Sequence, residues 1–287
     1  MLLFFYFFVT RLEKDGFEGQ DIQQLTKQNH YAKIFYGDNM ILNSGRKINI
    51  FHSQETASTN DDAKAAAKKC EEGALFTADR QTCGRGRMGR SFFSPDGGLY
   101  ASLLLKPRFS AENTLLITVC GAVAAALAIE EISSKTTEIK WVNDIFIDGK
   151  KVCGILTEGA FNENGAFEYA VLGLGVNLTA PEGGFPKELE NIAGALFKSG
   201  NSADLKEKFL KGFCNKFFEF YENIEKREYL DIYRKKSMLI GKTVSYIKNG
   251  KEYEAKVTGI TEKAELTVFK DGKSENLNSG EVKIILK

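Results

Sequence analysis

The chain has 287 residues, of which 43% are hydrophobic and 27% charged, so there is ample apolar material for a globular core. The formal net charge of +1 excludes a global basic field that would attract nucleic acid, and it argues against DNA binding. The five cysteines form no C-x-x-C pair and there are only two histidines, which argues against a disulfide framework, a zinc site and a Ser-His-Asp triad. Free thiols favour a reducing compartment, the cytoplasm.

Two apolar segments invite a membrane interpretation that their details do not support. Residues 1–9 are too short to span a bilayer, which needs about 20 apolar residues, and they lack the basic start and the cleavage site of a secretory signal. Residues 115–132 are nearly long enough, but Thr118 and Gly121 interrupt them and they run into Glu130. Their many alanines predict a buried helix, so we expect no membrane association.

In chain order, the pattern is weak over residues 1–45 and sharpens at Lys47, where Ile48, Ile50 and His52 alternate with polar residues as in a strand. Capping residues, apolar runs and turn residues then predict the following elements: a helix through 63–69 capped by Thr59 or Asn60, strands over 75–78 and 99–105, an alanine-rich helix over 112–132, and strands over 138–147, 151–161 and 167–178 joined by Asp-Gly and Asn-Gly turns.

The C-terminal part contains a long helix and then short strands. Ser202 opens an amphipathic helix whose apolar residues recur at four- and three-residue steps, a stripe typical of core packing. The stripe comprises Leu205, Phe209, Phe213, Phe217, Tyr221 and Ile224. From Gly241 onward, short alternating segments separated by Asn-Gly, Asp-Gly and Ser-Gly turns predict a small β-barrel.

The segment 84–91, with the sequence GRGRMGRS, is the most distinctive motif. Its spacing matches the G-x-G-x-x-G dinucleotide fingerprint and approaches a phosphate-binding P-loop, but residues 92–98 cannot begin the helix that both motifs require. Arg-Gly segments that bind nucleic acid are usually longer and repeated, and a plain solvated turn rarely holds three glycines in eight residues. We therefore favour a mobile loop that closes over an anionic ligand, because glycines permit close approach and arginines donate to carboxylate and phosphate.

Two further motifs lie within predicted strands. In Lys140-Trp141-Val142-Asn143-Asp144, a lysine amid apolar residues is costly unless it is paired or used, although Lys140 at an exposed strand end would be equally consistent. The glycines of 173–178 indicate either a close backbone approach within a strand or a bulge.

Together these segments resemble the biotin–protein ligase family. The resemblance spans residues 48–287 and rests on motifs in a fixed order: Ser58-Thr59-Asn60, Gln81-Thr82, Gly84 to Arg90, Phe93-Ser94-Pro95, Gly98-Leu99-Tyr100, Lys140 to Asp144, Lys151 to Glu158 and Gly173 to Asn177. Each motif is weak alone, and the ordered set is specific. The sequence departs from the family at Met88, Phe92 and Val142, where arginine, tryptophan and proline are usual; Met88 removes a loop charge, and the other two are expected to be packing changes.

The resemblance implies an enzyme, a ligase that forms an amide bond. It would activate biotin with ATP to biotinyl-5′-AMP and transfer the biotin to a specific lysine of a biotin carboxyl carrier protein, such as that of acetyl-CoA carboxylase. No covalent enzyme nucleophile is used, so the main tasks are positioning and charge stabilisation. Mg²⁺ would arrive with ATP and needs few protein ligands.

The resemblance also assigns roles to residues. The catalytic residues would be Lys140, which binds the biotin carboxylate and the α-phosphate, and Arg85 and Arg87, which hold phosphate and close the loop. The residues expected to bind biotin are Ser58, Thr59, Asn60, Gln81, Arg85, Gly86, Arg87 and Lys140, and those expected to bind the nucleotide are Arg90, Lys151 and Asn177.

The fold implied by the resemblance is α+β: a mixed, largely antiparallel sheet with packed helices, like that of class II synthetases, followed by an SH3-like β-barrel. We expect an unassigned segment over 1–45, the catalytic domain over 46–238 and the barrel over 239–287. A homodimer is common in the family. Two alternatives stay open: a lipoate-type acyl-protein ligase, and a non-catalytic biotin-sensing regulator, for which 1–45 is short and weakly patterned as a winged helix.

Overall fold

The computed structural model describes residues 38–109, 113–198, 202–248, 250–278, 280 and 282–285. The expectations for residues 1–9, and for all but the end of 1–45, lie outside these described residues. Residues 36–287 form one compact unit. The predicted boundary between 238 and 239 falls within that unit, between its last helix and the strands that follow, and the division into two domains stays a prediction.

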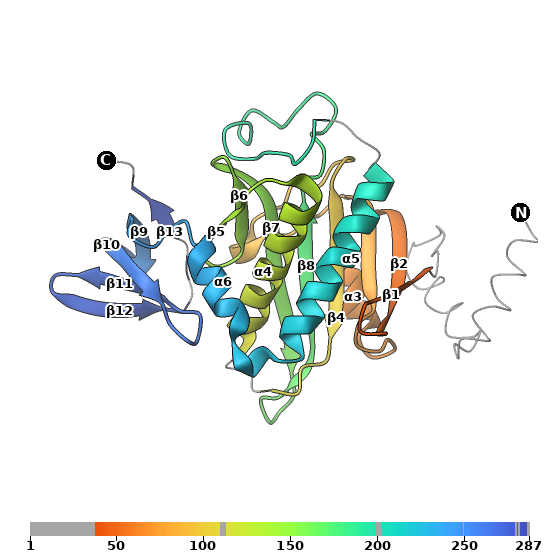
Figure 1. Cartoon of the computed structure of the whole chain (residues 1–287), viewed down its shortest axis with the longest axis horizontal. Coiled ribbons are helices and arrows are strands. Elements are labelled where there is room, and N and C mark those ends of the chain that lie inside the picture. The colour runs from red at the N-terminus through yellow and green to blue at the C-terminus, as the bar shows by residue number, and fades with distance from the viewer. Residues whose placement is uncertain are drawn as a thin grey trace, which may run out of the picture. The chain divides into compact units, whose positions relative to one another are not determined.

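The described residues form two sheets (Figure 1). The large sheet contains eight strands in the order β1-β2-β3-β4-β8-β7-β6-β5, and every neighbouring pair is antiparallel except β2 and β3, which are parallel. The small sheet contains five antiparallel strands in the order β12-β11-β10-β9-β13. This mixed, largely antiparallel arrangement with packed helices confirms the predicted α+β class.

The bounds of the elements are as follows. The large sheet is built from β1 (Asp38–Ile41), β2 (Lys47–Thr56), β3 (Leu75–Gln81), β4 (Leu99–Leu105), β5 (Glu138–Lys140), β6 (Asp144–Ile147), β7 (Lys150–Phe161) and β8 (Phe167–Val176). The small sheet is built from β9 (Thr243–Lys248), β10 (Lys251–Ile260), β11 (Leu266–Lys270), β12 (Lys273–Leu277) and β13 (Val282–Ile284). The α-helices are α3 (Thr59–Ala66), α4 (Thr114–Ser133), α5 (Ser202–Tyr221) and α6 (Glu228–Lys236).

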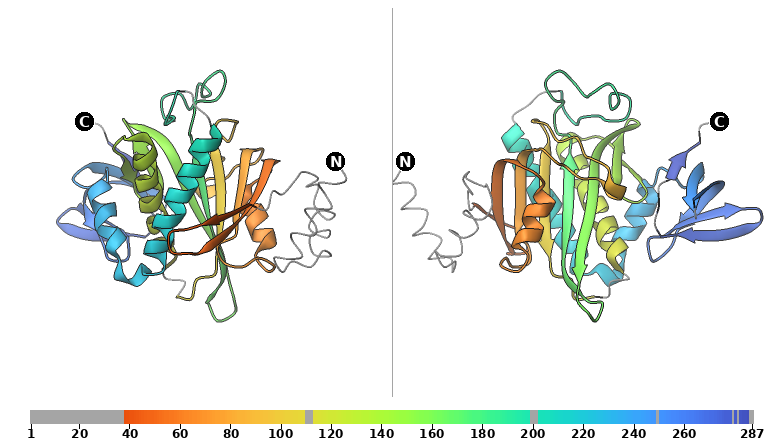
Figure 2. Two further views of the ribbon diagram at one scale, coloured as in Figure 1. Left: turned by 45° about the vertical axis from the view of Figure 1, so that its right-hand side comes forward. Right: turned by 180° about the vertical axis from the view of Figure 1, so that it is seen from behind.

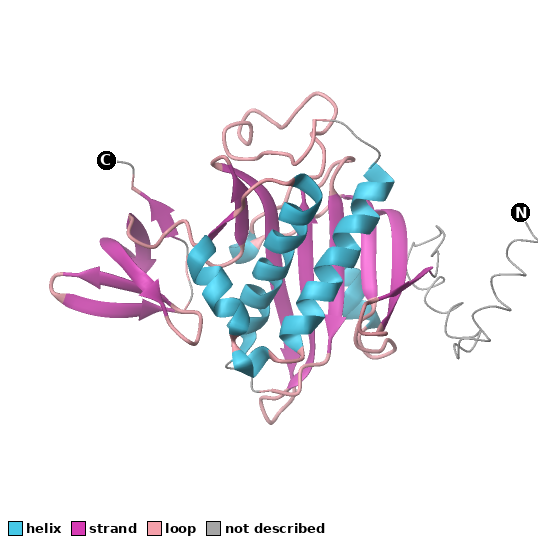
Figure 3. Cartoon of the chain, in the orientation of Figure 1, coloured by secondary structure: helices cyan, strands magenta, loops and turns pink. Residues whose placement is uncertain are grey.

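The helices cover the two faces of the large sheet unequally. Helices α4, α5 and α6 lie together on one face, and the short helix α3 lies on the other (Figure 2). Between β8 and α5 the chain runs as a long loop beyond one end of the sheet (Figure 3). The face that carries α3 is therefore the less covered one, and it holds the glycine- and arginine-rich loop.

Helix α4 is the predicted alanine-rich helix, and it is the centre of the core. It is apolar all round its circumference, as expected of a helix buried on every side, and Ile117, Cys120 and Ala124 are wholly inaccessible. It is the one described helix that is long and apolar enough to cross a membrane, and 72% of its most apolar window is buried inside the protein. Packing between the sheet, α5 and α6 accounts for its composition.

Helix α5 carries the predicted apolar stripe. Phe209, Phe213 and Phe217 are fully buried, and their rings stack in series with centroids 6.0 and 5.7 Å apart. Tyr221 continues the stack, 5.2 Å from Phe217. The stripe is core packing against α4, as its spacing predicted, and Ile224 falls just beyond the helix in a single 3₁₀ turn.

Two local predictions from the sequence were wrong. The predicted strand over 138–147 is two antiparallel strands, β5 and β6, because residues 141–143 form a turn. That turn is anchored by Trp141, whose buried Nε1 donates to the carbonyl oxygen of Ala264 at 2.9 Å. Helix α3 has Ser58 as its N-cap, in place of Thr59 or Asn60, and it ends at Ala66.

Candidate functional site

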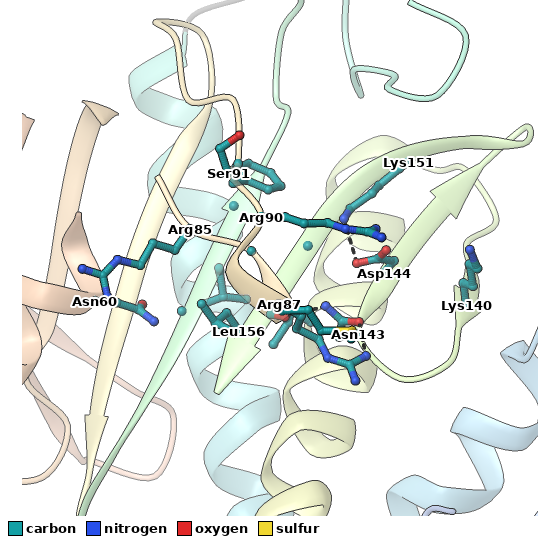
Figure 4. A pocket seen from close by; sticks show the side chains of 18 of the residues that line it. Asn60, Arg85, Arg87, Arg90, Ser91, Lys140, Asn143, Asp144, Lys151 and Leu156 are labelled. Atoms are coloured by element: carbon teal, nitrogen blue, oxygen red, sulfur yellow. Dashed lines mark hydrogen bonds and ion pairs between the residues drawn. The ribbon is translucent and has the colours of Figure 1, made fainter. Parts of the chain in front are cut away.

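A cavity of about 390 Å³ opens on the α3 face of the large sheet (Figure 4). Its walls are the start of α3, the end of β3 with the following loop, the turn between β5 and β6, parts of β7 and β8, the loop at Ile192, and the C-terminal segment at Gly280 and Val282. All but one of the predicted site residues line it, namely Ser58, Thr59, Asn60, Gln81, Arg85, Gly86, Arg87, Arg90, Lys140 and Lys151. The fold therefore brings together motifs that are up to about ninety positions apart in the sequence.

One end of the cavity is a network of uncharged polar side chains, which we call the amide end. The backbone N–H and the Oγ1 of Thr59 both donate to Oε1 of Gln81, at 2.9 and 3.1 Å. The Nε2 of Gln81 donates to Oγ of Ser94 at 3.0 Å, and that hydroxyl donates to the carbonyl oxygen of Phe92 at 2.8 Å. Each group is held by its neighbour, so the amide end is fixed before a ligand arrives.

Asn60 is the most constrained member of the amide end. Its Oδ1 accepts from Oγ of Ser102 at 2.6 Å, and its Nδ2 donates to Oε2 of Glu158 at 2.7 Å. A Cβ atom added at Gly173 would lie 2.1 Å from Oδ1 of Asn60. The first glycine of the 173–178 motif is therefore needed for space, because any side chain there would displace Asn60.

The opposite end, which we call the cationic end, is built around Lys151. Its Nζ lies 2.8 Å from Oδ1 of Asp144 and 5.7 Å from the centre of the Phe92 ring. Arg90 extends toward this pair, whereas Asn60 and Arg85 lie at the far end of the cavity (Figure 4). Lys140 also lines the cavity, but it lies to one side of the group formed by Arg90, Asp144 and Lys151 (Figure 4).

The arginine loop crosses the cavity and is bonded to three other segments. Arg85 pairs with Asp61 of α3 at 2.5 Å. Arg87 donates to Oδ1 of Asn143 at 3.1 Å and to the carbonyl oxygen of Gly280 at 3.3 Å, so it joins the loop to the β5–β6 turn and to the small sheet. Residues 87–89 form a single 3₁₀ turn and no longer helix follows, which agrees with the exclusion of a dinucleotide fingerprint and a P-loop.

The three departures from the family pattern have distinct surroundings. Met88 has a φ of 56° and is 73% exposed at the cavity rim. Phe92 packs over glycines, because a Cβ at Gly175 would lie 2.4 Å from its ring. Val142 is 2% exposed, and its carbonyl oxygen accepts from the hydroxyl of Tyr233 at 3.1 Å. Val142 is thus a buried packing position, Phe92 is a half-buried one, and Met88 is a surface position.

Asn177 is the predicted site residue that does not line the cavity. Its Nδ2 donates to the carbonyl oxygen of Gly194 at 2.9 Å. The backbone of Lys151 bonds to the same loop, with its N–H on the carbonyl oxygen of Ile192 at 2.7 Å and its own oxygen accepting from Gly194 at 2.9 Å. Asn177 therefore holds the loop segment that frames Lys151.

Several residues of the site were not singled out from the sequence. Ser102 lies in the apolar strand β4 and Asp61 is a polar residue in an ordinary amphipathic context, so nothing in their spacing marks them. Glu158 ends the motif that begins at Lys151, but it was assigned no role. Gly280 and Val282 come from the far end of the chain, and only the fold brings them to the cavity. No group of three or more His, Cys, Asp or Glu that could hold a metal ion occurs among the described residues.

The cavity can bind a ligand of two chemical parts. The amide end offers fixed donors and acceptors to a neutral polar group, and such groups are recognised by matched hydrogen bonds. The cationic end offers Lys151 and the arginine loop to anions such as carboxylate and phosphate.

The comparisons with known proteins agree with this geometry. The model of the biotin/lipoate A/B protein ligase family matches residues 50–177, which include every wall of the cavity except the loop at Ile192 and the C-terminal segment. A bifunctional ligase/repressor BirA of Bacillus subtilis is 39% identical over 148 residues, which cover 51% of this chain and 45% of the relative. A biotin--[acetyl-CoA-carboxylase] ligase of Paracoccus denitrificans is 36% identical over 132 residues, covering 45% of this chain and 55% of the relative. The chain thus spans about half the length of these curated relatives.

A solved structure covers more of the chain. The biotin protein ligase of Aquifex aeolicus in complex with biotin and ATP superposes with a TM-score of 0.69 at 27% sequence identity, covering 83% of this chain and 99% of that one. The likeness therefore includes the fold as well as the motifs.

Proposed function

We propose that the chain is a biotin–protein ligase, which activates biotin with ATP and attaches it to a lysine of a carrier protein. Residues 50–177 match the model of the biotin/lipoate A/B protein ligase family, and the fold is similar to that of a biotin protein ligase of Aquifex aeolicus. The observation that carries this proposal is the union of the amide end and the cationic end in one cavity. Biotin has the matching form, because its ureido ring is neutral and polar and its valeryl chain ends in a carboxylate.

The first step joins two anions. A biotin carboxylate oxygen attacks the α-phosphorus of ATP, the bond to the β-phosphate breaks, and pyrophosphate leaves. The residues of the cavity perform no covalent step, and they lower the barrier by neutralising charge and holding the reacting groups together. Lys151 is the cation best placed for the carboxylate and α-phosphate oxygens, with Arg90 beside it (Figure 4).

This assignment differs from the sequence-based expectation, which gave that role to Lys140 and placed Lys151 at the nucleotide. Lys151 is held over Phe92 and against Asp144, within the strand β7 that floors the cavity. Lys140 stands at the end of the short strand β5 and to one side (Figure 4). For Lys140 we propose a different role from the expected one, as a contact for the outer part of the nucleotide.

The loop arginines would act on closure. Arg85 is bonded to Asp61, and Arg87 to Asn143 and Gly280. Phosphate oxygens are stronger acceptors than a backbone carbonyl or a side-chain amide, so a bound nucleotide would draw Arg87 into the cavity. The closed loop would then exclude water from the mixed anhydride, which water hydrolyses.

The residues present fit a magnesium ion that is held mainly by phosphates. Asp144 is the only carboxylate among the described lining residues, and its Oδ1 is buried and makes an ion pair but no hydrogen bond. Mg²⁺ commonly takes one or two carboxylates with substrate phosphates as the remaining ligands. Asp144 would be its protein ligand, and the ion would offset the phosphate charge.

In the second step, the amine of an acceptor lysine attacks the acyl carbon of biotinyl-5′-AMP, AMP leaves, and an amide forms. The names of two relatives point to the biotin carboxyl carrier protein of acetyl-CoA carboxylase as the acceptor. A cytoplasmic location would place the enzyme with that carboxylase.

Mass spectrometry of an acceptor tests the whole reaction. The protein is incubated with ATP, Mg²⁺ and a biotin carboxyl carrier domain, with either biotin or lipoate, and the acceptor is weighed. We expect the acceptor to gain one biotinyl group on a single lysine, in the presence of biotin only. Modification by lipoate alone would identify a lipoate-type ligase, and an unmodified acceptor with intact biotin binding would favour the non-catalytic regulator.

A further inference from the structure

Glu158 lies behind the amide end and is absent from the cavity lining, yet it contacts a residue that lines it. Its Oε2 accepts from Nδ2 of Asn60 at 2.7 Å, and its Oε1 accepts from Nζ of Lys64 at 2.5 Å. The side chain of Glu158 is 27% exposed and that of Lys64 is 25% exposed, so water reaches this pair only in part. Glu158 thus connects the surface of α3 to the amide that faces the ligand.

The partners of Asn60 determine which way its side-chain amide is oriented. A carboxylate can only accept hydrogen bonds, so the amide nitrogen of Asn60 must be the atom that faces Glu158. The amide oxygen then faces Ser102, whose hydroxyl lies 2.6 Å from it. The same hydroxyl lies 2.7 Å from Oγ1 of Thr59, whose own hydrogen is directed to Oε1 of Gln81, so the single hydrogen of Ser102 is shared between two acceptors and Ser102 alone does not fix the amide. The orientation of the Asn60 amide is therefore set by what stands at position 158.

The charge on Glu158 is maintained by its neighbours. Partial burial alone would raise the pKa of Glu158, but hydrogen bonds from Asn60 and Lys64 and the charges of Lys64 and Arg85 outweigh it, so the pKa lies below its ordinary value. Asp61 of α3 shares Lys64 with Glu158, its Oδ1 lying 3.6 Å from Nζ, and is also paired with Arg85. Glu158 consequently stays an acceptor at neutral pH.

We propose that Glu158 is a positioning residue that sets the ligand specificity of the amide end by fixing the orientation of the Asn60 side chain. The inference rests on the proposed function, and it concerns how that function selects its acid. With the amide fixed, the second hydrogen of Nδ2 and the remaining lone pair of Oδ1 are available to a ureido group in one geometry only. A ring without such donors and acceptors, such as the dithiolane of lipoate, would leave these buried groups unsatisfied, which is costly.

Glu158→Gln tests this directly, because the glutamine side chain has the same shape but can present either an acceptor or a donor to Asn60. Biotin-dependent exchange of pyrophosphate into ATP is measured as a function of biotin and of ATP. We expect the KM for biotin to rise about tenfold, with kcat and the KM for ATP nearly unchanged, as for the loss of a matched buried hydrogen bond. The preference for biotin over lipoate should fall by a similar factor.

A double-mutant cycle separates positioning from a structural role. In an Asn60→Ala background, Glu158→Gln should change the KM for biotin no further, because the group that it orients is gone. Lys64→Gln is the matched control, since it removes the other partner of Glu158 and leaves the bond to Asn60, and it should change the KM less than about twofold. Ser102→Ala removes the hydrogen bond to Oδ1 of the same Asn60 amide. If Glu158→Gln does not fold, Ser102→Ala takes its place in the cycle.

The outcomes are distinguishable. An unchanged KM in Glu158→Gln, or an equal effect with and without Asn60, would overturn the inference while leaving a working ligase. A wild-type protein that shows no dependence on biotin would instead overturn the proposed function.

Discussion

The two ends of the cavity differ in how firmly they are built. At the amide end, Thr59 and Asn60 are 3% and 5% exposed, and each polar atom is held by a side chain of α3, β3, β4 or β7. At the cationic end, Arg90 is exposed, Met88 is 73% exposed, and both lie on a loop. One end is part of the folded framework, and the other is largely carried by a loop that can move.

This difference follows the chemistry of the two tasks. Discrimination between neutral rings depends on hydrogen-bond direction, which requires fixed atoms. Neutralising phosphate depends on charge, which tolerates small shifts in position, and the charge must reach the ligand after ATP has entered. Lys151 is the exception at the cationic end, since it is fixed on a strand, and for that reason we place it at the reacting atoms.

Replacement of Lys151 should have the largest effect. In Lys151→Met the apolar stem stays over Phe92, but the charge at the carboxylate and α-phosphate is lost, and we expect kcat for adenylation to fall by about 10²–10³-fold. Single-turnover formation of biotinyl-5′-AMP measures this. Lys140→Met is the control at the side of the cavity and should lower the rate much less. A larger loss in Lys140→Met would return the central role to Lys140.

Two glycines allow the ends to be perturbed separately. Gly173→Ala places a Cβ against Asn60 and should weaken biotin binding, whereas Gly175→Ala places one against Phe92 and should impair the ATP-dependent step. Each should also lower the free energy of unfolding by about 1–3 kcal/mol through overpacking. Isothermal titration with biotin, and exchange assays at saturating biotin, distinguish the two. Gly259→Ala, where a Cβ meets nothing within 4 Å, is the control.

The identical response of both variants to biotin and to ATP would contradict the separation of the cavity into two ends. It would indicate that the sheet moves as one body under either substitution.

The loop position Met88 should give a smaller effect, confined to the cationic end. Met88→Arg restores the charge usual in the family at an exposed position, so the free energy of unfolding should change by less than about 0.5 kcal/mol. The KM for ATP should fall about two- to fivefold at low ionic strength and less at high salt, since exposed charges are screened. A lower KM for biotin with no change in the KM for ATP would show that position 88 acts at the amide end, which would contradict this prediction.

The smallest expected effect is that of Glu158→Gln on the stability of the protein in acid. The pKa of Glu158 is lowered, despite the opposing effect of burial, by Asn60 and Lys64, so its contacts stabilise the fold above its ordinary pKa of 4.5 and are lost as the pH falls through the lowered value. Glu158→Gln should therefore reduce the decline in unfolding free energy below about pH 4.5. Urea unfolding at pH 7 and pH 4 measures the difference, and an unchanged decline would show that Glu158 does not contribute.

Local patterns predicted most of the fold. Alternation, Asp-Gly and Asn-Gly turns and the aromatic stripe of α5 were sufficient for the strands β2 to β4, β7 and β8 and for the helices α4 and α5. The turn at 141–143 was not predicted, because Trp141 and Val142 read as apolar strand residues, and the reason that they turn is the contact of Trp141 with Ala264, more than one hundred positions away.

The sequence predicted those parts of the site that lie within its motifs. The amide end and the arginine loop came from contiguous residues, and ten of the eleven assigned residues line one cavity. The relative placement of Lys140 and Lys151 depends on a three-strand arrangement, so sequence spacing could not rank them. Glu158 and Ser102 act through Asn60, and only tertiary contacts mark such residues.

The measurement that tests the central claim most directly is exchange of labelled pyrophosphate into ATP, with biotin, with lipoate or with neither acid. We predict rapid exchange that requires biotin and Mg²⁺ and is lost in Lys151→Met. Exchange that lipoate supports and biotin does not would contradict the assignment of the amide end to a ureido ring. Absence of exchange with either acid would contradict the claim that this cavity performs adenylation.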